Sequence, residues 1–310
     1  MNYLVTGGAG FIGSHLADKL LELGNSVTVV DDFSTGKERN LSQHNRNKNL
    51  KIQRRNICAS LDEIFEKEGF DAVFHLAALA RVQFSIKHPS LTHNVNVNGT
   101  FNLLNCCEKY NVKKVIFSSS SSVYGDQNIL PFNEDMSPNP KSPYALHKLI
   151  GEEYSRLFFE IYRLKSVSLR YFNVYGPRQN PEGDYACLIP KLITMIANNR
   201  VPVINGDGEQ TRDFTYVSDV VEANLAALES EEAVGYSFNI GSGKSTSVNE
   251  ITKMLLDLSG SHIHPVHVNP VIEPRNTLAG IEKSREILRW SPKVTLEEGI
   301  KETYKFFTGN

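Results

Sequence analysis

Hydrophobic and polar positions follow two alternating patterns along the first half of the chain. Short apolar or β-branched runs precede longer segments in which apolar residues recur every three or four positions. This alternation is typical of a parallel sheet whose strands are joined by crossover helices. The short runs predict strands over residues 3–6, 26–30, 50–54, 72–76, 114–118 and 167–171. The helical patterns predict helices over residues 11–23, 61–68, 91–110 and 143–163.

The pattern changes after about residue 173. Turn-forming sequences such as Gly176-Pro177 become frequent. Helical patterns then recur over residues 188–198, 218–228, 248–259 and 296–307, separated by short extended pieces. We therefore expect an α/β protein with a doubly wound parallel sheet over residues 1–172. Residues 173–310 should form mainly a smaller C-terminal α/β lobe, folded against the crevice of the sheet, with some segments returning to the first domain.

Composition excludes several classes of protein. The 310 residues carry a formal net charge of −2 and no long basic stretch, so we expect no nucleic-acid partner. No apolar stretch approaches membrane-spanning length, and the N-terminus leads directly into a strand without an export signal. The four cysteines contain no Cys-x-x-Cys pair. We therefore expect reduced thiols in a cytoplasmic protein that does not associate with a membrane.

A glycine-rich turn lies between the first predicted strand and the first predicted helix, at residues 7–13 (Gly-Gly-Ala-Gly-Phe-Ile-Gly). Gly7 permits a tight turn, Gly10 lets a pyrophosphate approach the backbone, and Gly13 allows close packing of helix and strand. Asp31 ends the second strand and can bind an adenosine ribose diol. An acidic group there disfavours the 2′-phosphate of NADP, so the turn predicts a Rossmann-like domain that binds NAD.

Tyr144 and Lys148 are four residues apart and so share one face of a predicted helix. An ammonium group there can stabilise a tyrosinate and lower the pKa of the phenol. The serine-rich run at residues 117–125 precedes this pair, and a hydroxyl from it would complete a proton-transfer device for a substrate alcohol. Together with the glycine turn, these residues predict nicotinamide-dependent chemistry at a carbinol carbon.

Other motifs have simpler explanations. Residues 241–245 (Gly-Ser-Gly-Lys-Ser) resemble part of a P-loop, but Phe238 stands where that motif requires its first glycine. The histidines at 262, 264 and 267 lack a nearby carboxylate or cysteine at ligand spacing, so we expect a surface strand there and no metal site. Arg212 and Arg275 lie in the lobe that should cover the crevice. Either could bind diphosphate oxygens or be solvated, and both interpretations stay open.

These motifs occur in an order that resembles the extended short-chain dehydrogenase/reductase superfamily. Within it the chain is most similar to NAD-dependent nucleotide-sugar epimerases of the UDP-glucose and UDP-N-acetylglucosamine 4-epimerase type. The matching landmarks run nearly end to end, at residues 7–13, 31–32, 75–78, 94–100, 117–125, 144–148, 170–178, 206–214 and 238–241. The resemblance implies an NAD-binding Rossmann domain over residues 1–172 and a mainly substrate-binding lobe over residues 173–310.

The resemblance also implies a role for each matching residue. Tyr144 would transfer the proton, with Lys148 and Ser120 as the other catalytic groups. The implied cofactor-binding residues are Gly7, Gly10, Phe11, Ile12, Gly13, Asp31, Asp32, Asn56, Ile57, Leu76, Ala77, Ala78, Asn96, Ser118, Tyr144, Lys148 and Tyr171. The implied substrate-binding residues are Ser120, Tyr144, Asn173, Leu188, Arg212, Arg275 and Thr277.

The implied reaction is the 4-epimerisation of a UDP-hexose through a transient 4-keto sugar. The related 4,6-dehydratases carry Thr-Asp-Glu where this chain has three serines at residues 120–122, and serines cannot readily supply the carboxylate that dehydration needs. A UDP-glucuronate 4-epimerase, or another NAD(P)-dependent nucleotide-sugar dehydratase or reductase, stays open as an alternative. Thr277 stands where a bulky aromatic excludes 2-acetamido sugars in some members, which favours UDP-GlcNAc and UDP-GalNAc as substrates in addition to UDP-Glc and UDP-Gal.

The residues over 178–186 and 204–209 look most like members that act on N-acetylhexosamines. Three departures from the family pattern are Asn56, Asn205 and Gly280. The helices predicted over residues 91–110 and 143–163 match those that form a four-helix dimer interface in the family, so we expect a homodimer. Its apolar contacts could come from Leu103, Leu104, Leu149 and Leu157, although burial against the sheet is the alternative.

Overall fold

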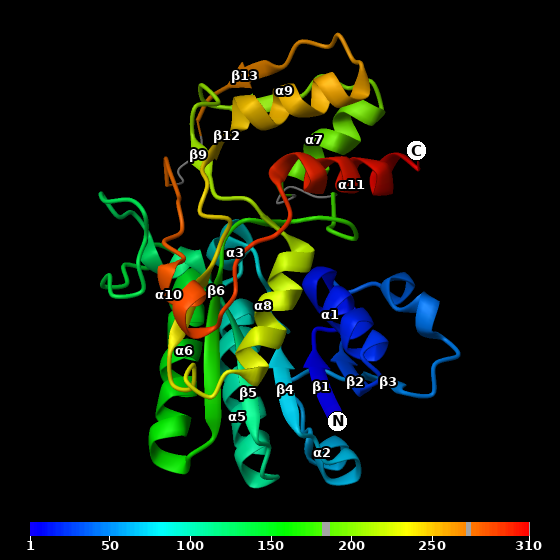
Figure 1. Cartoon of the computed structure of the whole chain (residues 1–310), viewed down its shortest axis with the longest axis vertical. Coiled ribbons are helices and arrows are strands. Elements are labelled where there is room, and N and C mark those ends of the chain that lie inside the picture. The colour runs from blue at the N-terminus through cyan, green and yellow to red at the C-terminus, as the bar shows by residue number, and fades with distance from the viewer. Residues whose placement is uncertain (182–186, 271–273, 310) are drawn as a thin grey trace.

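The computed structural model describes residues 1–181, 187–270 and 274–309 and is built on a seven-stranded parallel sheet (Figure 1). The strands lie in the order β11-β6-β5-β4-β1-β2-β3. Their bounds are β1 (Asn2–Thr6), β2 (Ser26–Asp31), β3 (Leu50–Arg54), β4 (Ala72–His75), β5 (Lys114–Ser120), β6 (Lys165–Tyr171) and β11 (Ser237–Ile240). The order of the first six strands is that of doubly wound dinucleotide-binding folds. The predicted fold class is therefore confirmed.

Helices cover both faces of this sheet because successive side chains of a strand point to opposite sides. Tyr3 and Val5 of β1 belong to one buried cluster, with α1 (Phe11–Glu22) and α8 (Val217–Glu229). Leu4 belongs to a second cluster, with α2 (Asp62–Glu68), α5 (Thr100–Lys109) and α6 (Pro143–Tyr162). The inner strands β1, β2 and β4 are largely apolar and buried since both faces are covered, whereas the edge strand β3 is mostly exposed.

Leu103 and Leu104 of α5 lie in the second cluster and are 0% and 1% exposed. They pack against the protein's own sheet, so the suggestion that they form a dimer interface is wrong. Leu149 is likewise partly buried, in a third apolar cluster around Tyr124 and Phe132. Leu157 remains 37% exposed.

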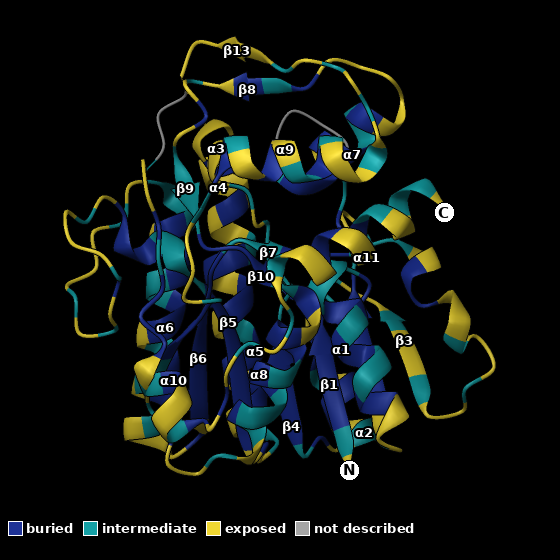
Figure 2. Cartoon of the chain, turned by 45° about the horizontal axis from the view of Figure 1, so that its top comes forward, coloured by how far each residue is buried: buried dark blue, intermediate teal, exposed yellow. Residues whose placement is uncertain are grey.

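A separate apolar core holds together the part of the chain above the carboxyl ends of the strands (Figure 2). It is formed by α7 (Leu188–Ala197), α9 (Val248–Ser259) and α11 (Leu296–Thr308). Short strand pairs connect these helices, namely β7 (Val174–Tyr175) with β10 (Thr215–Tyr216), β9 (Thr211–Arg212) with β12 (Thr246–Ser247), and β8 (Val203–Asn205) with β13 (Val266–Val268). β11, α8 and α10 (Glu282–Ile287) lie with the main sheet, although they follow residue 172. The division at residue 172 stays a prediction.

The segment from residue 82 to residue 109 differs most from the sequence prediction. Two short helices, α3 (Val82–Lys87) and α4 (Pro89–His93), precede a π-helical stretch, η3 (Asn94–Gly99), which continues into α5. Pro89 begins α4, because proline is favoured in the first turn of a helix. The prediction missed α3 because its six residues are too few for a periodic pattern. Short 3₁₀ turns are η1 (Glu38–Asn40), η2 (Ser42–His44) and η4 (Ser121–Tyr124).

Among the described residues, no helix combines the length and the apolar character needed to cross a membrane. The sequence of residues 178–186 resembles that of family members acting on N-acetylhexosamines. Residues 182–186 of this stretch lie outside the described residues.

Candidate functional site

The turn between β1 and α1 has a shape that requires glycine. Gly7 has a φ of +69°, and a Cβ atom on it would lie 2.7 Å from the backbone nitrogen of Ala77. A Cβ atom on Gly13 would lie 2.3 Å from the carbonyl oxygen of Gly7. Gly10 is the N-cap of α1, and no side chain caps this helix end. Backbone N–H groups therefore border a turn in which Gly7, Gly8 and Gly10 lack side chains, an arrangement that suits a pyrophosphate.

Asp31 fastens this turn to the end of β2. Its Oδ2 accepts a hydrogen bond from the Ala9 N–H at 2.9 Å, and its Oδ1 accepts one from the Phe33 N–H at 2.8 Å. Burial raises the pKa of Asp31, and these two N–H groups oppose the rise. The neighbouring Asp32 accepts from the side-chain amide of Asn56 at 2.7 Å. The structure thus brings both predicted acidic residues and Asn56 together beside the glycine turn.

The loop after β4 contains three further predicted cofactor residues, Leu76, Ala77 and Ala78. Asn96 of η3 holds this loop through the backbone of Leu79, accepting from its N–H at 2.8 Å and donating to its carbonyl oxygen at 3.2 Å. Asn96 is 3% exposed. Its observed role is therefore to fix the loop that faces the glycine turn.

The remaining predicted cofactor residues lie along the same edge of the sheet. Phe11 and Ile12 begin α1, and Ile57 is buried after β3. The hydroxyl of Tyr171 donates to Asn224 Oδ1 at 3.0 Å, and the Ser118 hydroxyl also bonds to Tyr171. Burial raises the pKa of Tyr171, so this phenol is a neutral hydrogen-bonding group.

Three consecutive serines at the end of β5 meet three residues spaced four apart on α6. The carbonyl oxygen of Ser118 accepts from Lys148 Nζ at 2.5 Å. The hydroxyl of Ser119 donates to the Glu152 carboxylate. The hydroxyl of Ser120 hydrogen-bonds to Tyr144. Because residues four apart share a helix face, one strand end fixes the whole predicted catalytic group.

The electrostatic states of this group differ from the simple expectation for a Tyr–Lys pair. Burial raises the pKa of Tyr144, and the bond from Ser120 and the charge of Arg81 oppose that rise. The sequence predicted a lowered phenol pKa, but desolvation dominates here. Burial also lowers the pKa of Lys148 to about 8, and the charge of Glu152 opposes this change. The Lys148 ammonium lies 5.9 Å from the centre of the Tyr144 ring.

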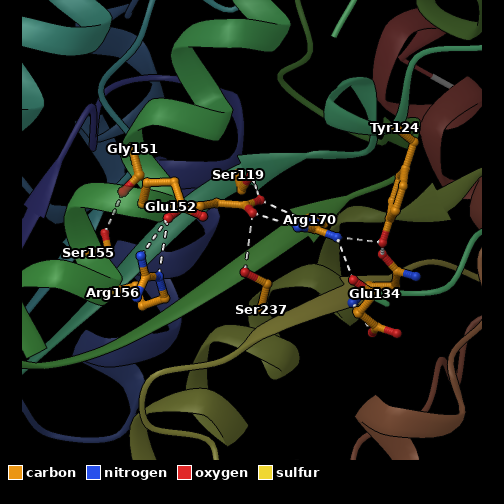
Figure 3. A network of polar contacts seen from close by, with 11 residues as sticks. Ser119, Tyr124, Glu134, Gly151, Glu152, Ser155, Arg156, Arg170 and Ser237 are labelled. Carbon is orange, nitrogen blue, oxygen red and sulfur yellow. Dashed lines mark hydrogen bonds and ion pairs between the residues drawn. The ribbon is translucent and has the colours of Figure 1, made fainter. Parts of the chain in front are cut away.

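Glu152 belongs to a buried polar network that sequence reasoning missed (Figure 3). Arg170 donates from Nε to Oε1 at 2.9 Å and from Nη2 to Oε2 at 2.7 Å. The Ser237 hydroxyl reaches Oε2 at 3.3 Å, and Arg170 also donates to the Tyr124 hydroxyl at 2.9 Å. The continued spacing of four from Tyr144 and Lys148 is the signal that could have identified Glu152.

Arg81 and Cys187 are two further residues that the sequence did not single out. Arg81 is the N-cap residue of α3, and its Nη1 donates to Cys187 Sγ at 2.7 Å. Cys187 in turn precedes α7, whose first residue is the predicted substrate residue Leu188. No motif surrounds either position, so only the folded structure brings them beside Tyr144.

Predicted substrate residues from three distant segments come together above the strand ends. The Asn173 side-chain amide lies 3.4 Å from the Thr277 hydroxyl. Arg212 donates from Nη1 to the carbonyl oxygen of Arg275 at 3.0 Å. The Arg275 guanidinium itself is exposed and pairs with Asp207 at 2.8 Å. Arg212, Arg275 and Thr277 therefore share one small sheet edge, whereas the Arg275 side chain turns toward a surface carboxylate.

Asp213 is a further residue of this region that the sequence analysis missed. Its carboxylate accepts from the backbone N–H groups of Ser242, Gly243 and Ala279, at 2.6, 2.9 and 3.1 Å. Asp213 is 0% exposed. It therefore joins the segment that contains Arg212 to the segment that contains Thr277.

Comparisons with known proteins agree with this geometry. A sequence profile of the NAD dependent epimerase/dehydratase family matches residues 3–241. A putative UDP-glucose 4-epimerase of Methanocaldococcus jannaschii is 40% identical over 308 residues, covering 99% of this chain and 98% of that protein. The structure of a Thermotoga maritima UDP-glucose 4-epimerase with UDP-glucose has a TM-score of 0.95 and 42% identity, covering 100% of this chain and 99% of the other.

A second solved structure is equally similar in fold. It is a UDP-N-acetylglucosamine 4-epimerase from Methanobrevibacter ruminantium in complex with UDP-N-acetylmuramic acid, with a TM-score of 0.95 and 40% identity. The match covers 99% of this chain and 98% of the other chain. With the sheet order, the glycine turn and the Ser–Tyr–Lys group in place, these matches show that the chain belongs to the NAD dependent epimerase/dehydratase family.

Proposed function

We propose that this protein is an NAD-dependent 4-epimerase of a UDP-hexose, working through a transient 4-keto sugar. The observation that carries the proposal is the hydrogen-bonded register of Ser118–Ser120 on β5 with Tyr144 and Lys148 on α6. This group lies at the carboxyl ends of the strands, beside the glycine turn between β1 and α1. Ligands of doubly wound sheets bind at this edge.

The chain's own residues would handle the proton. Tyr144 in its phenolate form would accept the O4 proton of the sugar, with Ser120 hydrogen-bonded to it. The buried Lys148 ammonium would favour the tyrosinate electrostatically. NAD, when bound, supplies the hydride acceptor and donor at C4, so that reduction on the opposite face of the ketose inverts that carbon.

The structure offers a fitting place for the cofactor. A Cβ atom on Gly7 or on Gly13 would collide with neighbouring backbone atoms of the glycine turn. With glycine at both positions, a pyrophosphate can approach the backbone there. The carboxylate of Asp31 ends the adjacent strand. An acidic group at this position favours the ribose diol of NAD over the 2′-phosphate of NADP.

The residues beside Ser120 argue against dehydration. Ser121 and Ser122 begin η4, and neither can supply the carboxylate that removal of water requires at neutral pH. A reductase would have to exchange its cofactor in every turnover, whereas an epimerase restores NAD within each turnover. NAD that stays bound through purification would therefore support epimerisation over reduction.

The decisive test removes one oxygen from the site. Tyr144→Phe should abolish interconversion of UDP-hexose 4-epimers while the fold and bound NAD are retained. Tyr236→Phe, at a tyrosine that is 54% exposed, is the matched control and should keep full activity. Near wild-type conversion by Tyr144→Phe would rule the proposed mechanism out.

We also propose a homodimer formed through α5 and α6. Four apolar side chains of these two helices are 37–62% exposed, namely Phe101 of α5 and Leu146, Leu157 and Ile161 of α6. Phe101 also packs against Tyr154 of α6, with ring centres 5.2 Å apart. Exposed apolar side chains on adjacent helices suit an interface between copies. Light scattering that shows only monomer at micromolar concentration would refute this part of the proposal.

A cytoplasmic location is likewise our proposal. All four cysteines are free in the structure, and Cys106 and Cys107 are buried. Free, buried thiols are typical of proteins kept in a reducing compartment.

A further inference from the structure

Arg81 lies between the two parts of the molecule, beside the catalytic phenol. It precedes α3, and α3 is fastened to the start of α6 because the Tyr144 N–H donates to the Ser85 hydroxyl at 3.0 Å. On its other side, Arg81 Nη1 donates to Cys187 Sγ at 2.7 Å, and Cys187 is the N-cap residue of α7. The charge of Arg81 also acts on the Tyr144 phenol, so the guanidinium lies near the Tyr144 hydroxyl.

Among the residues that the structure describes, no carboxylate balances the charge of Arg81. Within the described part of the chain, no carboxylate lies within ion-pair distance of its guanidinium, and its hydrogen-bond partner is a thiol. A thiol is a weak acceptor, whereas a guanidinium has five N–H donors. Arg170, by contrast, is paired with Glu152 at 2.7 Å. A half-buried cation without a counter-ion is costly unless a ligand supplies one.

We propose that Arg81 is a specificity-determining residue that pairs with a carboxylate carried by the hexose next to its reacting carbon. This inference rests on the proposed 4-epimerase function, because that function places the sugar against Tyr144. The planar guanidinium matches a carboxylate in two parallel hydrogen bonds. A hydroxyl or a neutral acetamido group would leave the positive charge uncompensated.

Two kinds of sugar carry such a carboxylate beside C4. In a hexuronate it is C6, attached to C5. In a muramate it belongs to an acidic ether on O3. Both place an anionic group one ring atom away from the carbon that Tyr144 addresses, so the experiment includes one substrate of each kind.

The test compares UDP-glucuronate, UDP-N-acetylmuramate, UDP-glucose and UDP-N-acetylglucosamine on the purified protein saturated with NAD. We expect at least one acidic UDP-sugar to have a kcat/KM above that of its neutral counterpart. Arg81→Gln should lower the acidic-to-neutral ratio roughly 10- to 100-fold, the range for a lost hydrogen-bonded charge pair. Arg81→Lys should restore part of the ratio, because it keeps the charge without the planar fork. Arg285→Gln, an exposed arginine on α10, is the matched control.

Calorimetric binding of the same four nucleotide sugars keeps the inference testable independently of turnover. If Arg81→Gln weakens binding and lowers kcat/KM equally for acidic and neutral sugars, Arg81 contacts the shared diphosphate or acts only on Tyr144. That result would overturn the inference. The inference would also be overturned if the wild type converts neutral UDP-sugars and shows no preference for acidic ones. That result would leave the proposed 4-epimerisation intact. If no UDP-hexose is converted, the proposed function fails, and a retained acidic preference in binding would still support Arg81 as the carboxylate partner.

Discussion

Glu152→Gln separates the structural and the electrostatic contributions of the network behind the catalytic group. The Glu152 carboxylate accepts two bonds from Arg170 and one each from Ser119 and Ser237. Its side chain and that of Arg170 are only 4% and 7% exposed. An amide keeps one acceptor oxygen but turns an N–H₂ group toward these donors. The substitution also leaves Arg170 without its counter-charge.

Breaking a buried ion pair from one side costs about 3–5 kcal/mol. At an unfolding entropy of about 2.1 cal/mol/K per residue, this chain of 310 residues loses about 1.5 °C in Tm for each kcal/mol. We therefore expect Glu152→Gln to lower the Tm by about 5–8 °C in a thermal melt. Glu153→Gln is the matched control. That carboxylate is 55% exposed, and its loss should change stability by less than about 1 kcal/mol.

The same substitution should also change the pH dependence of catalysis. The Lys148 pKa of about 8 is held up by the charge of Glu152 against the effect of burial. The ammonium is lost as the pH rises through that pKa, so kcat/KM of the wild type should fall above about pH 8. Removing the Glu152 charge lowers the Lys148 pKa further, and the alkaline limb should move to lower pH. If the Tm falls but the alkaline limb of the kcat/KM pH profile does not move, Glu152 only supports the fold.

Three further changes test other parts of the site. Gly13→Ala should lose bound NAD, measured by absorbance after gel filtration, because the added Cβ atom would lie 2.3 Å from the Gly7 carbonyl oxygen; full retention would contradict this role of the glycine turn. Thr277→Tyr should reduce kcat/KM for UDP-GlcNAc much more than for UDP-Glc, since Thr277 is 8% exposed and offers little space; equal loss for both sugars would remove Thr277 as a gate. Asp213→Ala should raise KM for the UDP-sugar and destabilise the protein by roughly 2–4 kcal/mol, because three backbone N–H groups lose their acceptor; an unchanged KM would show that the Asp213 contacts do not shape the substrate site.

The sequence by itself determined the features that depend on neighbours along the chain. The strand predicted over residues 50–54 is β3 with the same bounds. The glycines of residues 7–13 and the spacing of Tyr144 and Lys148 are local constraints, because a tight turn and a helix face each involve only a few consecutive residues. For the same reason the resemblance to nucleotide-sugar epimerases could be recognised from ordered motifs. The family match over residues 3–241 confirms it.

Only the tertiary structure decided which distant segments meet. β11 joins the sheet beside β6 although 65 residues separate Tyr171 from Ser237. Arg81 meets Cys187 across 106 positions, and Asn173 meets Thr277 across 104. Neither pair leaves a periodic or spaced pattern in the sequence. Likewise, the raised pKa of Tyr144 arises first from burial, which depends on everything packed around the phenol. Contacts and desolvation of this kind are set by the packing of the whole chain, and no local segment encodes them.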